Sequence, residues 1–128
     1  MALKLQLKGD EKLIIGGAVL RNGPKHAEIY VENNVPILRH KDIMSEDEAQ
    51  SPARRIYFVI QLMYIDVDNM QGYVEQYASL ARDIVEAAPS TQPFLLKISE
   101  QLAAGRSYQA LKTARQLIDY EKELIAHG

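Results

Sequence analysis

The spacing of apolar residues along the chain changes near Ser45. Before that point apolar and polar residues alternate: Leu3, Leu5 and Leu7 are interleaved with Lys4, Gln6 and Lys8. This alternation is typical of a strand with one buried face. Four more short strands are predicted, over residues 13–15, 18–21, 26–32 and 35–40, because turn signals rich in Gly, Asn and Asp separate these runs.

Beyond Ser45 apolar residues recur every three or four positions, which predicts helices. Ser51 and Pro52 form a start signal, with serine as N-cap and proline in the first turn. The expected helices cover residues 52–65, 70–88, 93–104 and 107–126. The first is apolar nearly all round, which suits the centre of a bundle or an interface. Gly105 is expected to end the third helix in the left-handed region.

These patterns predict an α+β fold. A small antiparallel β lobe, residues 1–45, is expected to precede an antiparallel four-helix bundle, residues 46–128. Five short strands are too little sheet to form a sandwich alone. An unpaired strand edge would also allow a homodimer.

Composition narrows the function classes. The 128 residues include no cysteine, which excludes disulfides, thiolate zinc sites and cysteine nucleophiles and fits a reducing cytoplasm. The alternating N-terminus is not a signal peptide, and the longest apolar stretch, residues 57–65, is about half a membrane span. We therefore expect a cytoplasmic protein without a membrane association.

Catalytic motifs are not apparent. The three histidines, His26, His40 and His127, stand apart from any acid or nucleophile at a recognisable spacing. Acidic pairs such as Glu121 and Glu123 are interpreted as parts of solvated helix faces. The sequence thus predicts a protein that is not an enzyme and needs no cofactor.

The charge is divided unevenly between the two halves. Residues 1–45 hold seven basic and five acidic side chains, or +2, and residues 46–128 hold eight and twelve, or −4. The lobe with the positive balance also has a set of polar candidates on its first and last strands: Lys4, Gln6, Lys8, Arg39, His40 and Lys41. If those strands lie side by side, the set would form a surface for single-stranded RNA; a solvated outer face is the alternative.

The first helix has candidate residues for a protein partner: Arg54, Arg55, Tyr57 and Tyr64. Tyrosines at this spacing belong either to a core or to an interface. Basic residues at a helix start oppose the helix dipole, which favours acids there. Either a partner or a salt bridge to an acid at 46–48 would account for Arg54 and Arg55.

Segments spread in order along nearly the whole chain form a pattern found in one known family: residues 3–5, 11–12, 17–19, 38–44, 52–58, 63–64, 108–112, 115, 117–118 and 120–121. Together these segments resemble the FlbT family of flagellum biosynthesis regulators. The resemblance implies a repressor that associates with the 5′ untranslated region of flagellin messenger RNA, represses translation or promotes mRNA decay, and works alongside the flagellar protein FlaF. Residues 9–16, 35–39 and 43 are also similar to the carbon storage regulator family of dimeric β-proteins, which implies leader-RNA binding by the first and last strands.

Two functions follow as hypotheses. In the first, Lys4, Lys8, Arg39 and Lys41 supply charge for phosphates while Gln6 and His40 contact base edges. In the second, the chain is a protein-interaction module, and its helical half binds flagellin or FlaF with only indirect effects on RNA.

Overall fold

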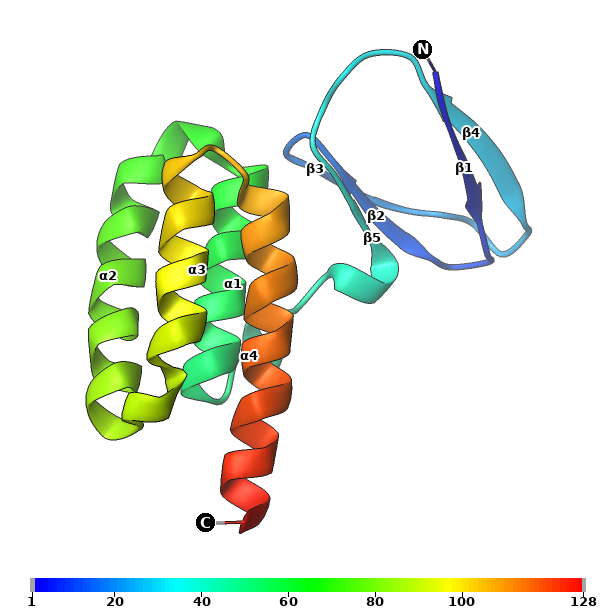
Figure 1. Ribbon diagram of the computed structural model, residues 1–128. Helices are drawn as coiled ribbons and strands as arrows, with labels where there is room; N and C mark the ends of the chain where they lie inside the picture. The colour runs from blue at the N-terminus through cyan, green and yellow to red at the C-terminus, as the bar shows by residue number, and fades with distance from the viewer. Residues whose placement is uncertain (1, 128) are drawn as a thin grey trace. The chain divides into compact units, whose positions relative to one another are not determined.

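A computed structural model describes residues 2–127 and divides the chain into two compact units, one ending at Ile43 and the other beginning at Met44 (Figure 1). The first, the strand unit, contains strands, and the second, the helical unit, contains helices. The predicted α+β class is confirmed. No helix within the described range is both long and apolar enough to cross a membrane.

Within residues 2–43 the strand unit has five strands: β1 (Leu3–Leu7), β2 (Lys12–Ile15), β3 (Ala18–Arg21), β4 (Ala27–Val31) and β5 (Ile37–Arg39). They form two antiparallel sheets, a β1–β4 pair and a three-stranded sheet in the order β3-β2-β5. The predicted last strand is too long, because residues 40–42 turn instead into a short 3-10 helix, η1 (His40–Asp42). The Ile43 amide donates to the His40 carbonyl and closes this turn.

The core of the strand unit is small. It contains Leu5, Leu7 and Leu13, with Ile15, Ile29, Val31 and Ile37 packed against them. Because Leu5 and Leu7 point inward, the alternating residues of β1 are exposed. The turn after β1 approaches the next loop closely, and a Cβ on Gly9 would lie 2.3 Å from the carbonyl oxygen of Pro24. Only glycine fits this position.

Within residues 44–127 the helical unit has four α-helices: α1 (Pro52–Ile65), α2 (Met70–Ala87), α3 (Gln92–Ala103) and α4 (Ser107–His127). Short 3-10 helices, η2 (Glu46–Glu48), η3 (Val67–Asn69) and η4 (Pro89–Thr91), precede α1, α2 and α3. α1 packs on both α2 and α4, and α3 packs mainly on α4 (Figure 1). This arrangement explains why α1 is apolar on so many sides.

The end of α3 is confirmed as predicted. Gly105 has φ +75°, the left-handed region. The Gly105 amide donates to the carbonyl of Leu102, and the Arg106 amide donates to that of Gln101. These two bonds form a Schellman motif, which satisfies carbonyls that the helix leaves free and turns the chain into α4.

A residue of α4 caps α1. The Ser51 side chain accepts from the Arg54 amide, as an N-cap does. Glu121 accepts from the Ser51 hydroxyl and, at 2.9 Å, from the Ala53 amide. The interpretation of Glu121 as a solvated residue is wrong, because this carboxylate is only 9% exposed. It supplies the negative charge that the dipole of α1 favours and that the sequence around Arg54 lacks.

Gln61 is the polar interruption in the apolar run of α1, and it is 3% exposed. Its side-chain amide accepts from the Met44 amide at 2.8 Å and donates to the Met44 carbonyl at 2.9 Å. A buried amide side chain needs such partners. Gln61 therefore fixes the first residue of the helical unit to α1.

Candidate functional surfaces

The outward face of the β1–β4 pair has four exposed side chains. Lys4 is opposite Tyr30 in the strand register, and Gln6 is opposite Glu28. The Lys4 ammonium lies 3.4 Å from a Glu28 carboxylate oxygen, and the Tyr30 hydroxyl donates to the other oxygen at 2.6 Å. The hydrogen bond to Glu28, followed by partial desolvation, raises the pKa of Tyr30. Part of the positive charge of β1 is thus offset by Glu28.

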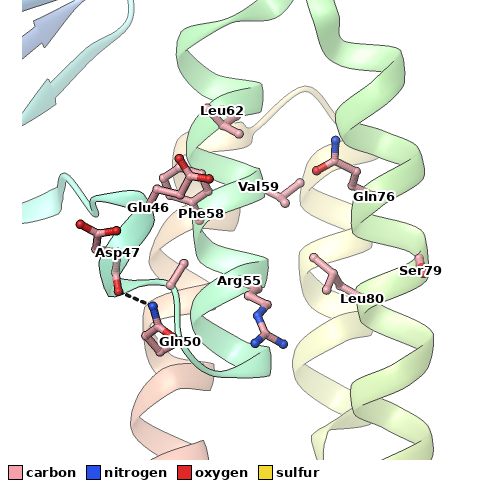
Figure 2. Close-up of a pocket in the computed structure, with 11 residues that line it drawn as sticks. Glu46, Asp47, Gln50, Arg55, Phe58, Val59, Leu62, Gln76, Ser79 and Leu80 are labelled. Atoms are coloured by element: carbon pink, nitrogen blue, oxygen red, sulfur yellow. Dashed lines mark hydrogen bonds between the residues drawn. The ribbon is translucent and has the colours of Figure 1, made fainter.

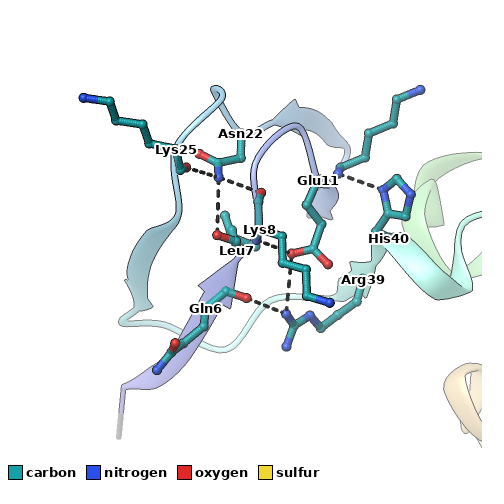
Figure 3. A network of polar contacts seen from close by, with 9 residues as sticks. Gln6, Leu7, Lys8, Glu11, Asn22, Lys25, Arg39 and His40 are labelled. Atoms are coloured by element: carbon teal, nitrogen blue, oxygen red, sulfur yellow. Dashed lines mark hydrogen bonds and ion pairs between the residues drawn. The ribbon is translucent and has the colours of Figure 1, made fainter.

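Arg39 connects the two sheets (Figure 3). β1 and β5 are not hydrogen-bonded neighbours, because β1 pairs with β4 and β5 pairs with β2. The Arg39 guanidinium nevertheless donates to the main-chain carbonyl of Gln6 at 2.8 Å and lies 4.0 Å from the Glu11 carboxylate. The same carboxylate accepts from the Lys8 amide at 3.0 Å. Arg39 and the main-chain amide of Lys8 therefore meet at Glu11, and Arg39 also holds the main chain of Gln6.

His40 has a structural contact of its own (Figure 3). Its Nδ1 accepts from the Lys12 amide at 2.9 Å, which joins η1 to β2. With Nδ1 as acceptor, the neutral ring carries its proton on Nε2. Lys41, in the same short helix, is exposed.

The four partner candidates of α1 are placed differently from one another. Tyr57 is 1% exposed, and its hydroxyl accepts from the Arg115 guanidinium at 3.0 Å, so its ring lies in the core. Tyr64 is half-buried, with its ring 5.7 Å from that of Tyr108. Arg55 is exposed and Arg54 is half-buried. Tyr64, Arg54 and Arg55 therefore reach the surface, whereas Tyr57 does not.

The acids of residues 46–48 do not form salt bridges with Arg54 or Arg55 in the described part of the chain. The pKa of Glu48 is lowered mainly by hydrogen bonds from the amide and hydroxyl of Ser45, and the charge of Arg54 adds to this effect. Arg54 thus acts on Glu48 at longer range. Arg55 lines the same groove as Glu46 and Asp47.

Arg55 lies at a groove between α1, α2 and the segment around η2 (Figure 2). The groove has a volume of about 790 Å³. Its apolar lining is Phe58, Val59, Leu62, Leu80 and Ala49, and its polar lining is Glu46, Asp47, Gln50, Arg55, Gln76 and Ser79. An apolar groove with charged residues at its rim is suited to a protein segment. Among the described residues no group of His, Asp and Glu is arranged to hold a metal ion.

Comparison with known proteins identifies the family. The family model described as "Flagellar protein FlbT" matches residues 3–125. The chain belongs to the FlbT family. This membership confirms the resemblance found in the sequence.

Named members of the FlbT family are similar over nearly the whole chain. A probable flagellum biosynthesis repressor protein FlbT 1 of Bradyrhizobium diazoefficiens is 42% identical, over 97% of this chain and 85% of that protein. The flagellum biosynthesis repressor protein FlbT of Caulobacter vibrioides is 36% identical, over 99% of this chain and 92% of that protein. No solved structure matches the chain.

Sequence reasoning missed three features of this FlbT-family structure. Glu11 was not expected beside Lys8 and Arg39, and Tyr30 was not recognised as a neighbour of Lys4. The groove beside Arg55 was missed as well. The alternation of residues 26–32 was a usable signal for Tyr30, because it places that residue on an outward face. The contact of Arg39 with Glu11 and the groove beside Arg55 depend on segments distant in the sequence, which local patterns do not reveal.

Proposed function

We propose that this protein represses flagellum biosynthesis after transcription. In this proposal it binds the 5′ untranslated region of flagellin messenger RNA in the cytoplasm and, without catalysis, lowers translation or promotes mRNA decay. The family match over residues 3–125 carries the proposal, together with relatives that are named repressors of flagellum biosynthesis.

The strand unit supports contact with RNA. Lys4 and Gln6 are exposed on β1, Lys8 is exposed just beyond its end, and Arg39 reaches β1 from β5. Phosphate contacts need exposed cations, and base contacts need amide or ring nitrogen groups. Arg39 and His40 have a second role, because their side chains hold the strand unit together. Lys4 and Lys8 are therefore the cleaner residues to test.

Gel-shift titration of the full chain with a flagellin 5′ leader RNA tests this function. Lys4→Ala and Lys8→Ala are expected to weaken binding, each lowering the slope of log affinity against log salt by roughly 0.7. Lys97→Ala, an exposed lysine of α3, is the matched control and should leave the slope unchanged. Absence of binding by the unaltered protein at micromolar concentration would overturn direct RNA contact.

A protein-interaction role is the second candidate, favoured by the groove between α1 and α2. The net charge of −4 in residues 46–128 also suits a protein better than RNA. In this version a FlaF-type protein or flagellin binds the helical unit, and the effect on RNA is indirect. Leu80→Ser in the groove should weaken binding to such a partner in calorimetry. Leu96→Ser, on the exposed side of α3, should not.

A further inference from the structure

The outward face of the β1–β4 pair holds an aromatic ring beside a cation and an amide. Tyr30 is 56% exposed and is the fourth of the five residues of β4, opposite the second residue of β1. Lys4 is directly opposite it in the register, and Gln6 and Glu28 form the adjacent pair on the same face. The apolar residues of both strands, Leu5 and Ile29 among them, point to the other face, into the core.

The ring is held at its hydroxyl end, and more than half of the residue is exposed. Its hydroxyl donates to Glu28 at 2.6 Å, and Glu28 is in turn 3.4 Å from the Lys4 ammonium. These contacts restrict the tyrosine side chain before any ligand arrives. A restricted ring loses less conformational entropy when a base stacks on it.

We infer that Tyr30 is a stacking residue for an unpaired RNA base, on a platform formed with Lys4 and Gln6. This inference rests on the proposed RNA-binding function and adds a residue and a geometry to it. Single-stranded nucleic acids bind through bases stacked on aromatic side chains and phosphates held by nearby cations. The outward face provides the aromatic ring of Tyr30 on β4 and the cation of Lys4 on β1.

The charges on the two strands orient the RNA. β1 has Lys4, with Lys8 just beyond its end, and β4 has Glu28. A phosphate over Glu28 would be repelled, so the RNA backbone follows β1 and the bases lie toward β4. In that orientation a base covers Tyr30, and the Gln6 amide and the Glu28 carboxylate face its edge. Glu28 can accept from the amino groups of cytosine, which favours such bases.

Tyr30→Ala, Tyr30→Phe and the control Tyr108→Ala test the inference in the full chain. Tyr108 is 40% exposed and lies on α4. The probe is the single-stranded flagellin leader RNA, titrated at several salt concentrations. Loss of one stacked base should weaken binding about 5- to 150-fold in Tyr30→Ala. The salt slope should stay that of the unaltered protein, because stacking neutralises no phosphate.

The variants separate the ring from its hydroxyl. Tyr30→Phe keeps the ring and should bind within about threefold of the unaltered protein, and Tyr108→Ala should bind equally well. If Tyr30→Phe loses as much affinity as Tyr30→Ala, or if the salt slope falls with Tyr30→Ala, the ring does not stack. A thermal melt of each variant verifies folding. Should Tyr30→Ala unfold, Tyr30→Leu replaces it, with the same expected loss and salt slope.

Failure of the two proposals is distinguishable. Unaltered protein that does not bind the leader overturns the proposed RNA function itself. Unaltered protein that binds it, with Tyr30→Ala equally tight, overturns only the role of Tyr30.

Discussion

The strand unit and the helical unit are stabilised by different kinds of contact. The helical unit has a continuous apolar core along α1, which includes the fully buried Ile56, Ile60 and Met63. The strand unit has a much smaller core and relies on polar side chains that reach main-chain groups across the fold. Asn22 donates to the carbonyls of Lys8 and Lys25, and Arg39 donates to that of Gln6.

This difference matters for interpreting mutations. In the helical unit a surface charge can be changed with little effect on the fold, since apolar burial dominates its stability. In the strand unit some polar residues that appear suited to ligand binding also hold the strands in place. A binding defect from Arg39→Ala would therefore not distinguish lost contact from lost structure.

Gly9→Ala should have the largest effect and should destabilise only the strand unit. The added Cβ would lie 2.3 Å from the Pro24 carbonyl, and neither main chain can move away cheaply. We expect a loss of about 3 kcal/mol or more. Hydrogen exchange should show β1 and β4 losing protection while α1 and α4 keep theirs. Gly23→Ala is the control, because its Cβ meets nothing within 4 Å. Equal protection in both variants would contradict the close approach.

Glu121→Ala should destabilise the helical unit by about 2–3 kcal/mol. The substitution removes the carboxylate that accepts hydrogen bonds from the Ala53 amide and the Ser51 hydroxyl, and these donors lose that acceptor. Denaturant unfolding followed by far-UV circular dichroism measures the change. Glu123→Ala, an exposed neighbour on α4, should stay within about 0.5 kcal/mol of the unaltered protein. A similar loss in both variants would exclude a capping role.

Arg39→Lys should cost the strand unit about 1–2 kcal/mol. Lysine keeps the charge but is shorter and lacks the planar guanidinium, one terminal nitrogen of which contacts both the Gln6 carbonyl and Glu11. Arg21→Lys is the matched control, because its ion pair with Asp10 is exposed on both sides. Hydrogen exchange of β1 and β5 compares the two variants. If Arg39→Lys were as stable as Arg21→Lys, Arg39 would be available to a ligand without structural cost.

The smallest expected effect is a change in how the stability of the helical unit depends on pH. The Tyr73 hydroxyl and then the Asn69 amide donate to Asp66 and lower the pKa of its carboxyl below 3.8. Ionised Asp66 therefore stabilises the fold above its ordinary pKa, and this stabilisation is lost as the pH falls through the lowered folded value. As the pH is lowered from about 5 to about 3, the melting temperature of Asp66→Asn should fall less steeply than that of the unaltered protein. An unchanged slope would show that these hydrogen bonds do not persist in solution.

Local patterns predicted the elements well for physical reasons. Alternation placed β1, and three-to-four spacing placed all four helices, because each depends on one buried face. Gly105 was predictable since the left-handed conformation strongly favours glycine. These signals are contained in a few consecutive residues.

Other features could not be predicted because distant residues create them. Glu121 caps α1 by accepting from Ser51, which lies 70 positions earlier, and no local signal shows that its carboxylate is buried. The same holds for the candidate site. Its exposed residues on β1 followed from alternation, whereas the contact of Arg39 with Gln6 depends on how two sheets meet. The absence of β1–β5 pairing is likewise a property of the whole strand order.

The pairing of Gln61 with Met44 has a consequence for how two ligands would influence each other. The strand unit ends at Ile43, and Met44 is already bound to α1 through both of its main-chain groups. The tether between the units is therefore very short. If the proposed messenger and protein partner belong to one complex, the second contact would form at an effective concentration on the order of millimolar. Two weak affinities would then combine into avidity without any new contact.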